Sequence, residues 1–105
     1  PSYLLPPVPP VVPLSVILVN YNVCYFLEQA LLSVRRAAEK LGEPVEVFVV
    51  DNNSVDGSVA MVKARFPEVQ LLENRHNCGF SRANNQALRL ARGQFVLVLN
   101  PDTII

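Results

Sequence analysis

Polar residues follow four apolar segments of this chain, at the points where side chains that bind a ligand could meet. The four polar segments are Asn20-Tyr21-Asn22, Asp51-Asn52-Asn53-Ser54, Asn77-Cys78-Gly79-Phe80 and Asn100-Pro101-Asp102. Their amide and carboxylate oxygens can accept hydrogen bonds, and a carboxylate can also bind a divalent cation. If the apolar segments are parallel strands, the polar segments share the sheet edge where open α/β folds bind ligands.

Two acidic residues are the strongest candidates for chemistry. Asp51 follows four apolar residues, so its carboxylate is expected at the mouth of a buried strand, where it can accept hydrogen bonds from a ring N–H and an amine or water. The alternative for Asp51 is a helix cap or an Asx turn. Asp102 follows Asn100-Pro101 and could hold a divalent cation that bridges diphosphate oxygens, the alternative being a Pro-Asp turn.

The amides and the aromatic residue of the first loop have two interpretations each. Asn20 and Asn22 could line a ligand pocket or could form a turn and cap a helix. Tyr21 could wall a flat ligand by stacking or could belong to the core. His76 is the single histidine, and a surface position is the simpler interpretation.

The third polar segment precedes an expected helix. Gly79 would let the backbone approach a ligand closely. Asn84 and Asn85 lie near the start of that helix, and consecutive asparagines are poor helix formers. At least one of them is therefore expected to point at the site or to tie loops together.

The elements that must position these residues alternate between strands and helices. Continuous apolar runs predict strands covered on both faces at 14–19, 45–50, 69–72 and 95–99. Apolar stripes at helical spacing predict helices from after Asn22 to Leu41, from about Gly57 to Phe66, and from an N-cap at Ser81 to Arg92. The expected fold is α/β, with a parallel doubly wound sheet in the order 3-2-1-4 and helices on both faces.

Composition excludes several classes of protein. The chain has 105 residues, in which nine Lys and Arg balance nine Asp and Glu, so charge gives no case for nucleic acid or an anionic membrane surface. No apolar run approaches the roughly 20 residues that cross a bilayer. Cys24 and Cys78 are the only cysteines and are expected as reduced, buried or half-buried thiols of a cytoplasmic protein. Residues 1–13 are Pro-rich and are expected as an extended leader before a domain at 14–105.

Taken together, the motifs resemble the family-2 glycosyltransferases of the GT-A fold, and the bacterial rhamnosyltransferase-like branch most closely. The resemblance covers residues 14–105. Its motifs are Val-Asn-Tyr-Asn, Val-Val-Asp-Asn-Asn-Ser-Val-Asp-Gly-Ser, Asn-Cys-Gly-Phe-Ser-Arg-Ala-Asn-Asn-Gln-Ala and Leu-Asn-Pro-Asp-Thr, in this order.

The resemblance implies an enzyme that transfers a sugar from a nucleotide-diphosphate donor to an acceptor hydroxyl, with inversion at the anomeric carbon. The acceptor would be a glycan or a lipid-linked molecule, and the enzyme would be cytoplasmic or at the inner face of the membrane. Asp51 would bind the base, and Asp102 would hold Mg²⁺ or Mn²⁺ on the diphosphate. The remaining residues expected to bind the nucleotide-sugar are Asn20, Tyr21, Asn22, Asn53, Asn77, Gly79 and Asn84.

The chain departs from the family pattern in two ways. Asn100 stands where the first acid of the DxD-type motif is expected, so the metal site has one carboxylate fewer. The family's acceptor site and catalytic base lie beyond this motif, so the chain is expected to be a donor-binding half that ends after Asn-Pro-Asp and is inactive alone. The alternatives are a non-catalytic nucleotide-binding module and a nucleotidyltransferase-like domain, although the latter usually has a glycine-rich basic loop after the first strand.

The last expected strand is strongly apolar, yet the expected strand order places it at the edge of the sheet. Residues 95–99 contain no charged residue, and few residues follow them in this chain. A long apolar strand at a sheet edge is a template for pairing with another chain. The 105-residue chain is therefore expected to self-associate across or near this strand.

Overall fold

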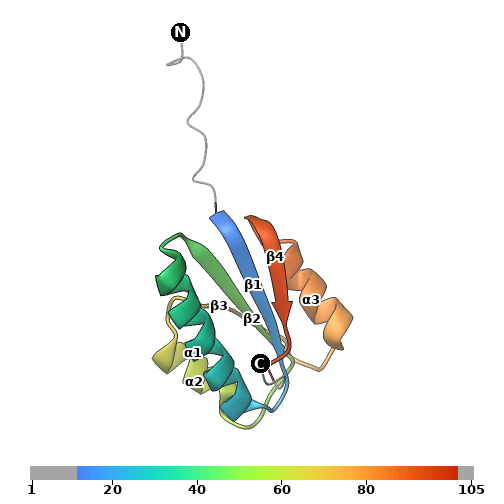
Figure 1. The fold of residues 1–105 in the computed structure, drawn as a ribbon. Coiled ribbons are helices and arrows are strands. Elements are labelled where there is room, and N and C mark those ends of the chain that lie inside the picture. The colour runs from blue at the N-terminus through green and yellow to red at the C-terminus, as the bar shows by residue number, and fades with distance from the viewer. Residues whose placement is uncertain (1–11, 102–105) are drawn as a thin grey trace.

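The computed structural model describes residues 12–101, in which strands and helices alternate as expected. The strands are β1 (Val12–Asn20), β2 (Val45–Asp51), β3 (Gln70–Glu73) and β4 (Gly93–Leu99), and the helices are α1 (Cys24–Leu41), α2 (Ser58–Arg65) and α3 (Phe80–Leu88). All neighbouring strands are parallel, in the order β3-β2-β1-β4 (Figure 1). The predicted α/β class and strand order are confirmed.

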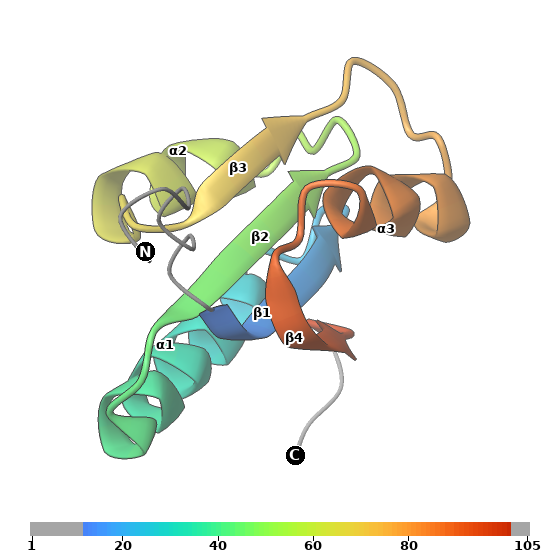
Figure 2. The ribbon, with the colours of Figure 1, turned by 90° about the horizontal axis from the view of Figure 1, so that it is seen from above.

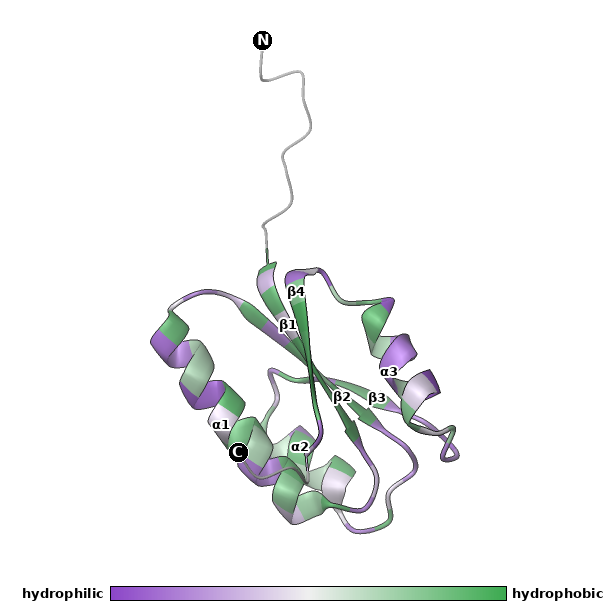
Figure 3. Cartoon of the chain, turned by 45° about the vertical axis from the view of Figure 1, so that its right-hand side comes forward, coloured by the Kyte–Doolittle hydropathy of each residue, from purple (hydrophilic) through white to green (hydrophobic). Residues whose placement is uncertain are grey.

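The helices cover both faces of the sheet. Val16 and Leu18 of β1 point to the face where α1 and α2 pack, whereas Ile17 points to the face covered by α3. Both ribbon views show α3 across the sheet from the other two helices (Figures 1 and 2). Because successive side chains of a strand point to opposite faces, a strand covered on both faces is apolar throughout. Figure 3 shows this contrast between hydrophobic strands and helices with mixed surfaces.

The first strand begins earlier than expected. Val12 pairs with Gly93 and Leu14 pairs with Phe95, so Pro13 lies within β1. Proline lacks an N–H but is tolerated at the start of a strand, where the missing donor removes at most one hydrogen bond between the strands. The leader expected at 1–13 is therefore wrong for its last two residues, and residues 1–11 lie outside the described part of the chain.

Glycines set two helix boundaries. α1 ends at Gly42, which has the left-handed φ of 69°, as the sequence predicts. The expected N-cap of α3 at Ser81 is wrong, because the helix already begins at Phe80, after Gly79 with φ 84°. α3 also ends at Leu88 instead of Arg92.

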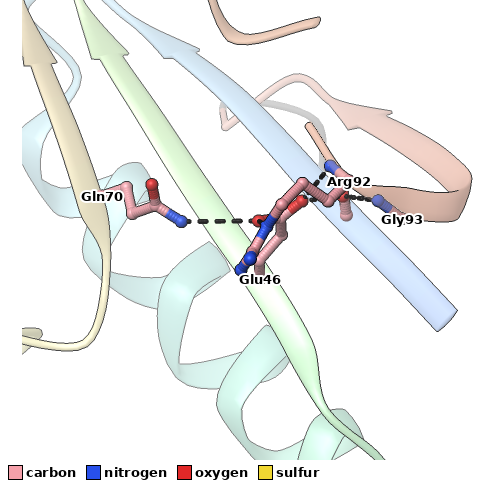
Figure 4. A network of polar contacts seen from close by, with 5 residues as sticks. Glu46, Gln70, Arg92 and Gly93 are labelled. Carbon is pink, nitrogen blue, oxygen red and sulfur yellow. Dashed lines mark hydrogen bonds and ion pairs between the residues drawn. The ribbon is translucent and has the colours of Figure 1, made fainter. Parts of the chain in front are cut away.

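A buried carboxylate joins all four strands at the amino edge of the sheet. Glu46 of β2 is 8% exposed, and it accepts a hydrogen bond of 2.5 Å from the Ser15 hydroxyl of β1 and another from the backbone N–H of Arg92. Longer contacts of 3.5 Å reach it from the Arg92 Nε and from Gln70 of β3. Figure 4 shows Glu46 between Gln70 on one side and Arg92 and Gly93 on the other.

The start of β4 approaches β1 too closely for any side chain. The Gly93 N–H donates to the Ser15 hydroxyl at 2.8 Å. A Cβ at position 93 would lie 2.5 Å from the Ser15 backbone nitrogen and 2.8 Å from the Leu14 carbonyl carbon. Glycine is thus required here for steric reasons, and the Ser15 hydroxyl relays the hydrogen bonds of Glu46 to β4.

Glu46 makes the stability of the fold depend on pH. Burial raises the pKa of its carboxyl, but the hydrogen bonds from Ser15 and Arg92 and the nearby Arg92 charge outweigh burial and hold the pKa below its usual range. The ionised form therefore stabilises the fold fully above the unfolded-state pKa of about 4.3. That contribution is lost as the pH falls through the lower pKa of the folded state.

We predict that Glu46→Gln lowers the free energy of unfolding by about 2 kcal/mol at pH 7, because an amide cannot accept all of these hydrogen bonds. The difference from the wild-type protein should shrink as the pH falls below about 4. Urea unfolding at several pH values measures it, with the exposed Glu43→Gln as the matched control. An equal loss at pH 7 and pH 3 would contradict the assignment.

Candidate functional site

The loops that follow β1, β2 and β3 begin side by side. Asn20 pairs with Asp51 in the parallel register. The Asn52 N–H donates to the Asn20 carbonyl at 2.9 Å, and the Asn74 N–H donates to the Asp51 carbonyl at 2.8 Å. Leu99 of β4 pairs with Leu18, which brings Asn100 to the same edge of the sheet. Asp102, the expected metal ligand, lies outside the described residues.

Asp51 and Asn20 form the buried floor of this edge. Asp51 is 2% exposed and Asn20 is fully buried. The Asn20 Nδ2 donates to the Asp51 Oδ1 at 2.9 Å, and the Ser54 N–H donates to the Asp51 Oδ2 at 2.8 Å. The second contact reaches the backbone three residues on, so Asp51 does order its loop, although the Asx turn of the alternative interpretation would reach only two residues on. The carboxylate thus orders its own loop, and each oxygen keeps a second lone pair for another donor.

The Asn20 amide is oriented by its acceptors. Its Nδ2 also donates to the Ser54 hydroxyl at 3.2 Å, so its Oδ1 points away from Asp51. That oxygen is buried and has no hydrogen-bond partner among residues 12–101. Such an orphaned acceptor is rare in folded proteins and marks a place where a donor from outside the chain could bind.

Asn22 ties the first loop to the second. Its Oδ1 accepts from the Val55 N–H at 2.8 Å, and its own N–H donates to the Ser54 hydroxyl at 2.9 Å. Its φ of 52° is in the left-handed region that asparagine tolerates. Tyr21, beside it, is 50% exposed, so it is not a core aromatic and is free to stack on a ligand.

Asp56 anchors the start of two helices. Its Oδ2 accepts from the Cys24 N–H of α1 at 2.9 Å, and its Oδ1 accepts from the Ser58 N–H of α2 at 3.1 Å and from the Ser58 hydroxyl at 2.5 Å. Desolvation raises the pKa of the Asp56 carboxyl, but the hydrogen bonds from Ser58 and Cys24 outweigh it and hold the pKa below its usual range. Asp56 thus fixes the start of α1 as well as the start of α2.

The remaining candidate residues are more exposed. Asn77 is exposed, and its Oδ1 accepts from the Gly79 N–H at 2.9 Å. Asn53 is exposed with φ 69°. Asn84 of α3 is half-buried, and its buried Oδ1 finds no hydrogen-bond partner within the described part of the chain.

Other features agree with the sequence or extend it. His76 is exposed, and both cysteines are half-buried free thiols, as expected. Asn74 and Gln86 are not among the residues expected at the site, yet their side chains are hydrogen-bonded to each other, and the Asn74 side chain also donates to Asn52. The only sequence signal for this pair was that a polar residue, Asn74, directly follows the third strand.

The described residues supply no complete metal site by themselves. Within 12–101, no three His, Cys, Asp or Glu side chains gather closely enough to hold an ion. Mg²⁺ is often held by one or two carboxylates together with substrate phosphates, so a single acid at this edge fits such an ion when a diphosphate is bound. No helix of the described part of the chain is long and apolar enough to cross a membrane.

Comparison with protein families shows to which family the chain belongs. The model of glycosyl transferase family 2 matches residues 15–105. The chain belongs to this family. Among curated relatives of this family-2 chain is the N-acetylglucosaminyl-diphospho-decaprenol L-rhamnosyltransferase of Mycobacterium tuberculosis, which is 36% identical over 100 residues. The match covers 85% of this chain and 32% of that relative.

Solved structures of similar proteins contain donor molecules. The mannosyltransferase PcManGT from Pyrobaculum calidifontis, in complex with GDP-Man and Mn²⁺, is 29% identical with a TM-score of 0.71 over 88% of this chain and 30% of that chain. TarS 1–349 of S. aureus, in complex with UDP-GlcNAc, is 28% identical with a TM-score of 0.73 over 87% of this chain and 27% of that chain. The family-2 chain thus has the GT-A architecture and spans about a third or less of these proteins.

We predict that Asp56→Ala lowers the free energy of unfolding by about 2 kcal/mol, since it removes acceptors at the starts of two helices at about 1 kcal/mol each. Asp56→Asn keeps one acceptor oxygen and should lose about half as much. Urea denaturation measures both variants, with the exposed Glu43→Ala as the control. Equal losses for the Ala and Asn variants would show that only one helix depends on Asp56.

Proposed function

We propose that the full-length protein transfers a sugar from a nucleotide-diphosphate donor to an acceptor hydroxyl, with inversion at the anomeric carbon, and that residues 14–105 form its donor-binding half. The proposal rests on one observation: hydrogen bonds connect the polar loops after β1, β2 and β3 at the carboxyl edge of the sheet. Two structural neighbours in complex with nucleotide-sugars support it.

In this proposal Asp51 accepts a hydrogen bond from a ring N–H of the base. Its two oxygens already accept from Asn20 and Ser54, so the carboxylate is held rigidly before the base arrives. A rigid acceptor loses little freedom on binding, which favours affinity. Tyr21 stacks on the base, and the other residues proposed to line the pocket are Asn20, Asn22, Asn53, Asn77, Gly79 and Asn84.

The diphosphate is proposed to lie between the first turn of α3 and the end of β4. Arg75 lies in the loop that leads into α3 and Arg82 lies in the first turn of α3, and a helix start carries partial positive charge that favours an anion. Asp102 would hold Mg²⁺ or Mn²⁺, and the ion would neutralise charge that grows on the leaving diphosphate. A neighbour in complex with Mn²⁺ supports this part of the proposal.

The acceptor site and the catalytic base are proposed to lie outside these residues, so this chain alone should not turn over substrate. We propose a glycan or lipid-linked acceptor and a cytoplasmic location at the inner face of the membrane. The support is the name of the mycobacterial relative, which describes a substrate linked to a lipid. Sugar transfer by the full-length protein, as opposed to nucleotide binding alone, would separate this proposal from a non-catalytic module.

We predict that Asp51→Asn raises the donor KM at least about tenfold in the full-length protein and that Asp102→Ala lowers kcat by a similar factor or more, at about 1.4 kcal/mol per tenfold. Asparagine keeps the shape of Asp51, and thermal melting shows whether the variant is folded. Glu43→Gln, at the opposite edge of the sheet, is the control. The assignment is wrong if folded variants keep wild-type donor binding and turnover.

The outer edge of β4 also supports a proposal about association. Within the described residues β4 pairs only with β1, and Phe95, Val96, Leu97 and Val98 are 72%, 41%, 45% and 38% exposed. A groove of about 1040 Å³ lies between α1 and the end of this strand. An unpaired apolar strand can bury its side chains and satisfy its N–H and C=O groups by pairing with another strand.

We predict that the 105-residue chain forms a dimer across or near β4. Sedimentation velocity at increasing concentration measures it, and Leu97→Lys should weaken the dimer because it places a charge on the paired edge. Lys63→Ala, a change on the exposed surface of α2, is the control. A monomer at high micromolar concentration would overturn this proposal without affecting the proposed enzyme activity.

A further inference from the structure

Four side chains from three parts of the chain form one hydrogen-bonded group, which we call the amide cluster: Asn52, Asn74, Cys78 and Gln86. Asn74 and Gln86 exchange two hydrogen bonds, from the Asn74 Nδ2 to the Gln86 Oε1 at 2.9 Å and from the Gln86 Nε2 to the Asn74 Oδ1 at 3.0 Å. The Asn74 Nδ2 also donates to the Asn52 Oδ1 at 2.9 Å. The cluster therefore links the loop after β2, the loop after β3 and α3.

The amide cluster holds both ends of the loop at 74–79. Asn74 is its first residue, and at its other end the Asn52 Nδ2 donates to the Gly79 carbonyl at 3.3 Å. The Cys78 Sγ lies 3.4 Å from the Asn52 Oδ1. Asn52 is 2% exposed and directly follows Asp51, so the loop is fixed relative to the buried carboxylate.

The elements on either side of the loop have other anchors. β3, which precedes the loop, is paired with β2, and β2 is in turn paired with β1. α3 packs Ala83 and Ala87, both fully buried, against the sheet. Removal of the cluster would leave these contacts in place and would release mainly the loop between them.

We infer that the amide cluster is a positioning device that sets the distance of the 74–79 loop from Asp51 and thereby the affinity for the nucleotide part of the donor. The inference rests on the proposed function, in which Asp51, Asn77 and Gly79 contact the nucleotide. Asn74 and Gln86 act through the loop and do not touch the donor. Their loss should therefore weaken donor binding and leave the chemical step nearly unchanged.

The test uses Asn74→Ala, Gln86→Ala and the double variant in the full-length protein. Calorimetric titration with UDP, GDP or dTDP in the presence of Mn²⁺ gives the dissociation constant. Each single variant should raise it about tenfold, because the remaining amide loses both hydrogen bonds of the Asn74–Gln86 pair. The double variant should be no weaker than either single one, because the two residues act as one pair. Gln29→Ala, which removes an exposed amide from α1, is the matched control.

Steady-state kinetics separates positioning from a merely structural role. Positioning predicts a higher donor KM with kcat within about twofold of wild type. Gln86→Glu, which keeps an acceptor for Asn74 and loses the donor, should have an intermediate KM. Lower melting temperature and lower kcat with unchanged affinity and KM would overturn the inference.

Hydrogen exchange without ligand tests the hold on the loop separately from the proposed function. The amides at 74–79 should exchange faster in Gln86→Ala than in wild type, while those of β1 and β2 should not change. Wild-type binding to none of the three nucleotides would overturn the proposed function, and faster exchange would then still support the hold on the loop. Nucleotide binding by wild type with unchanged affinity in the variants would overturn the positioning role alone.

Discussion

The hydrogen bond between Asn20 and Asp51 is the contact on which the carboxyl edge of the sheet depends. It joins the last residues of two paired strands, where the regular ladder ends and the loops begin. A buried carboxylate is costly unless its oxygens are hydrogen-bonded. Asp51 meets this requirement with one partner from β1 and one from its own loop, Ser54. Because the buried Asp51 carboxylate needs these hydrogen bonds, it fixes the start of the loop after β1 and the start of the loop after β2.

β2 carries a buried carboxylate near each end, Glu46 and Asp51, and the two differ in what they do for the protein. Glu46 is surrounded by donors from the other strands and serves to hold the sheet together. Asp51 accepts one hydrogen bond on each carboxylate oxygen, and the loops at this edge carry exposed residues such as Tyr21 and Asn53. The amino edge is therefore closed by its polar contacts, while the carboxyl edge keeps acceptor capacity for a ligand. The separation allows the loops to vary without loss of the contacts that stabilise the strands.

The sequence predicted the fold well because its strongest signals are repetitive. Uninterrupted apolar runs and helical stripes depend on periodic burial, which many residues report together. The boundaries depend on single residues: Gly79 adopts a backbone conformation that starts α3 earlier than the Ser81 hydroxyl suggests, and Pro13 fits the start of β1. Such local geometry is settled by tertiary contacts, which a pattern does not contain.

The sequence predicted which loops form the candidate site, but it did not predict which of their side chains are hydrogen-bonded to each other. Polar residues after Asn20 and Asp51 indicated which edge to examine, because parallel strands end together. The partnership of Asn74 with Gln86 has no sequence signal, since it depends on the path of the intervening loop. Asp56 resembled an ordinary turn residue, and only the packing of the two helices reveals that it starts both.

The strand order also has a consequence for the synthesis of this protein. Of the four strands in residues 12–101, β1 is made first, yet one of its two neighbours, β4, is made after the other three. Chains emerge with the N-terminus first, so β1 can pair with β2 long before residues 93–99 exist. During that interval one edge of the central strand presents apolar side chains and unpaired backbone groups to its surroundings. A pause of the ribosome between α3 and β4 would prolong the stage in which the nascent chain most needs a chaperone.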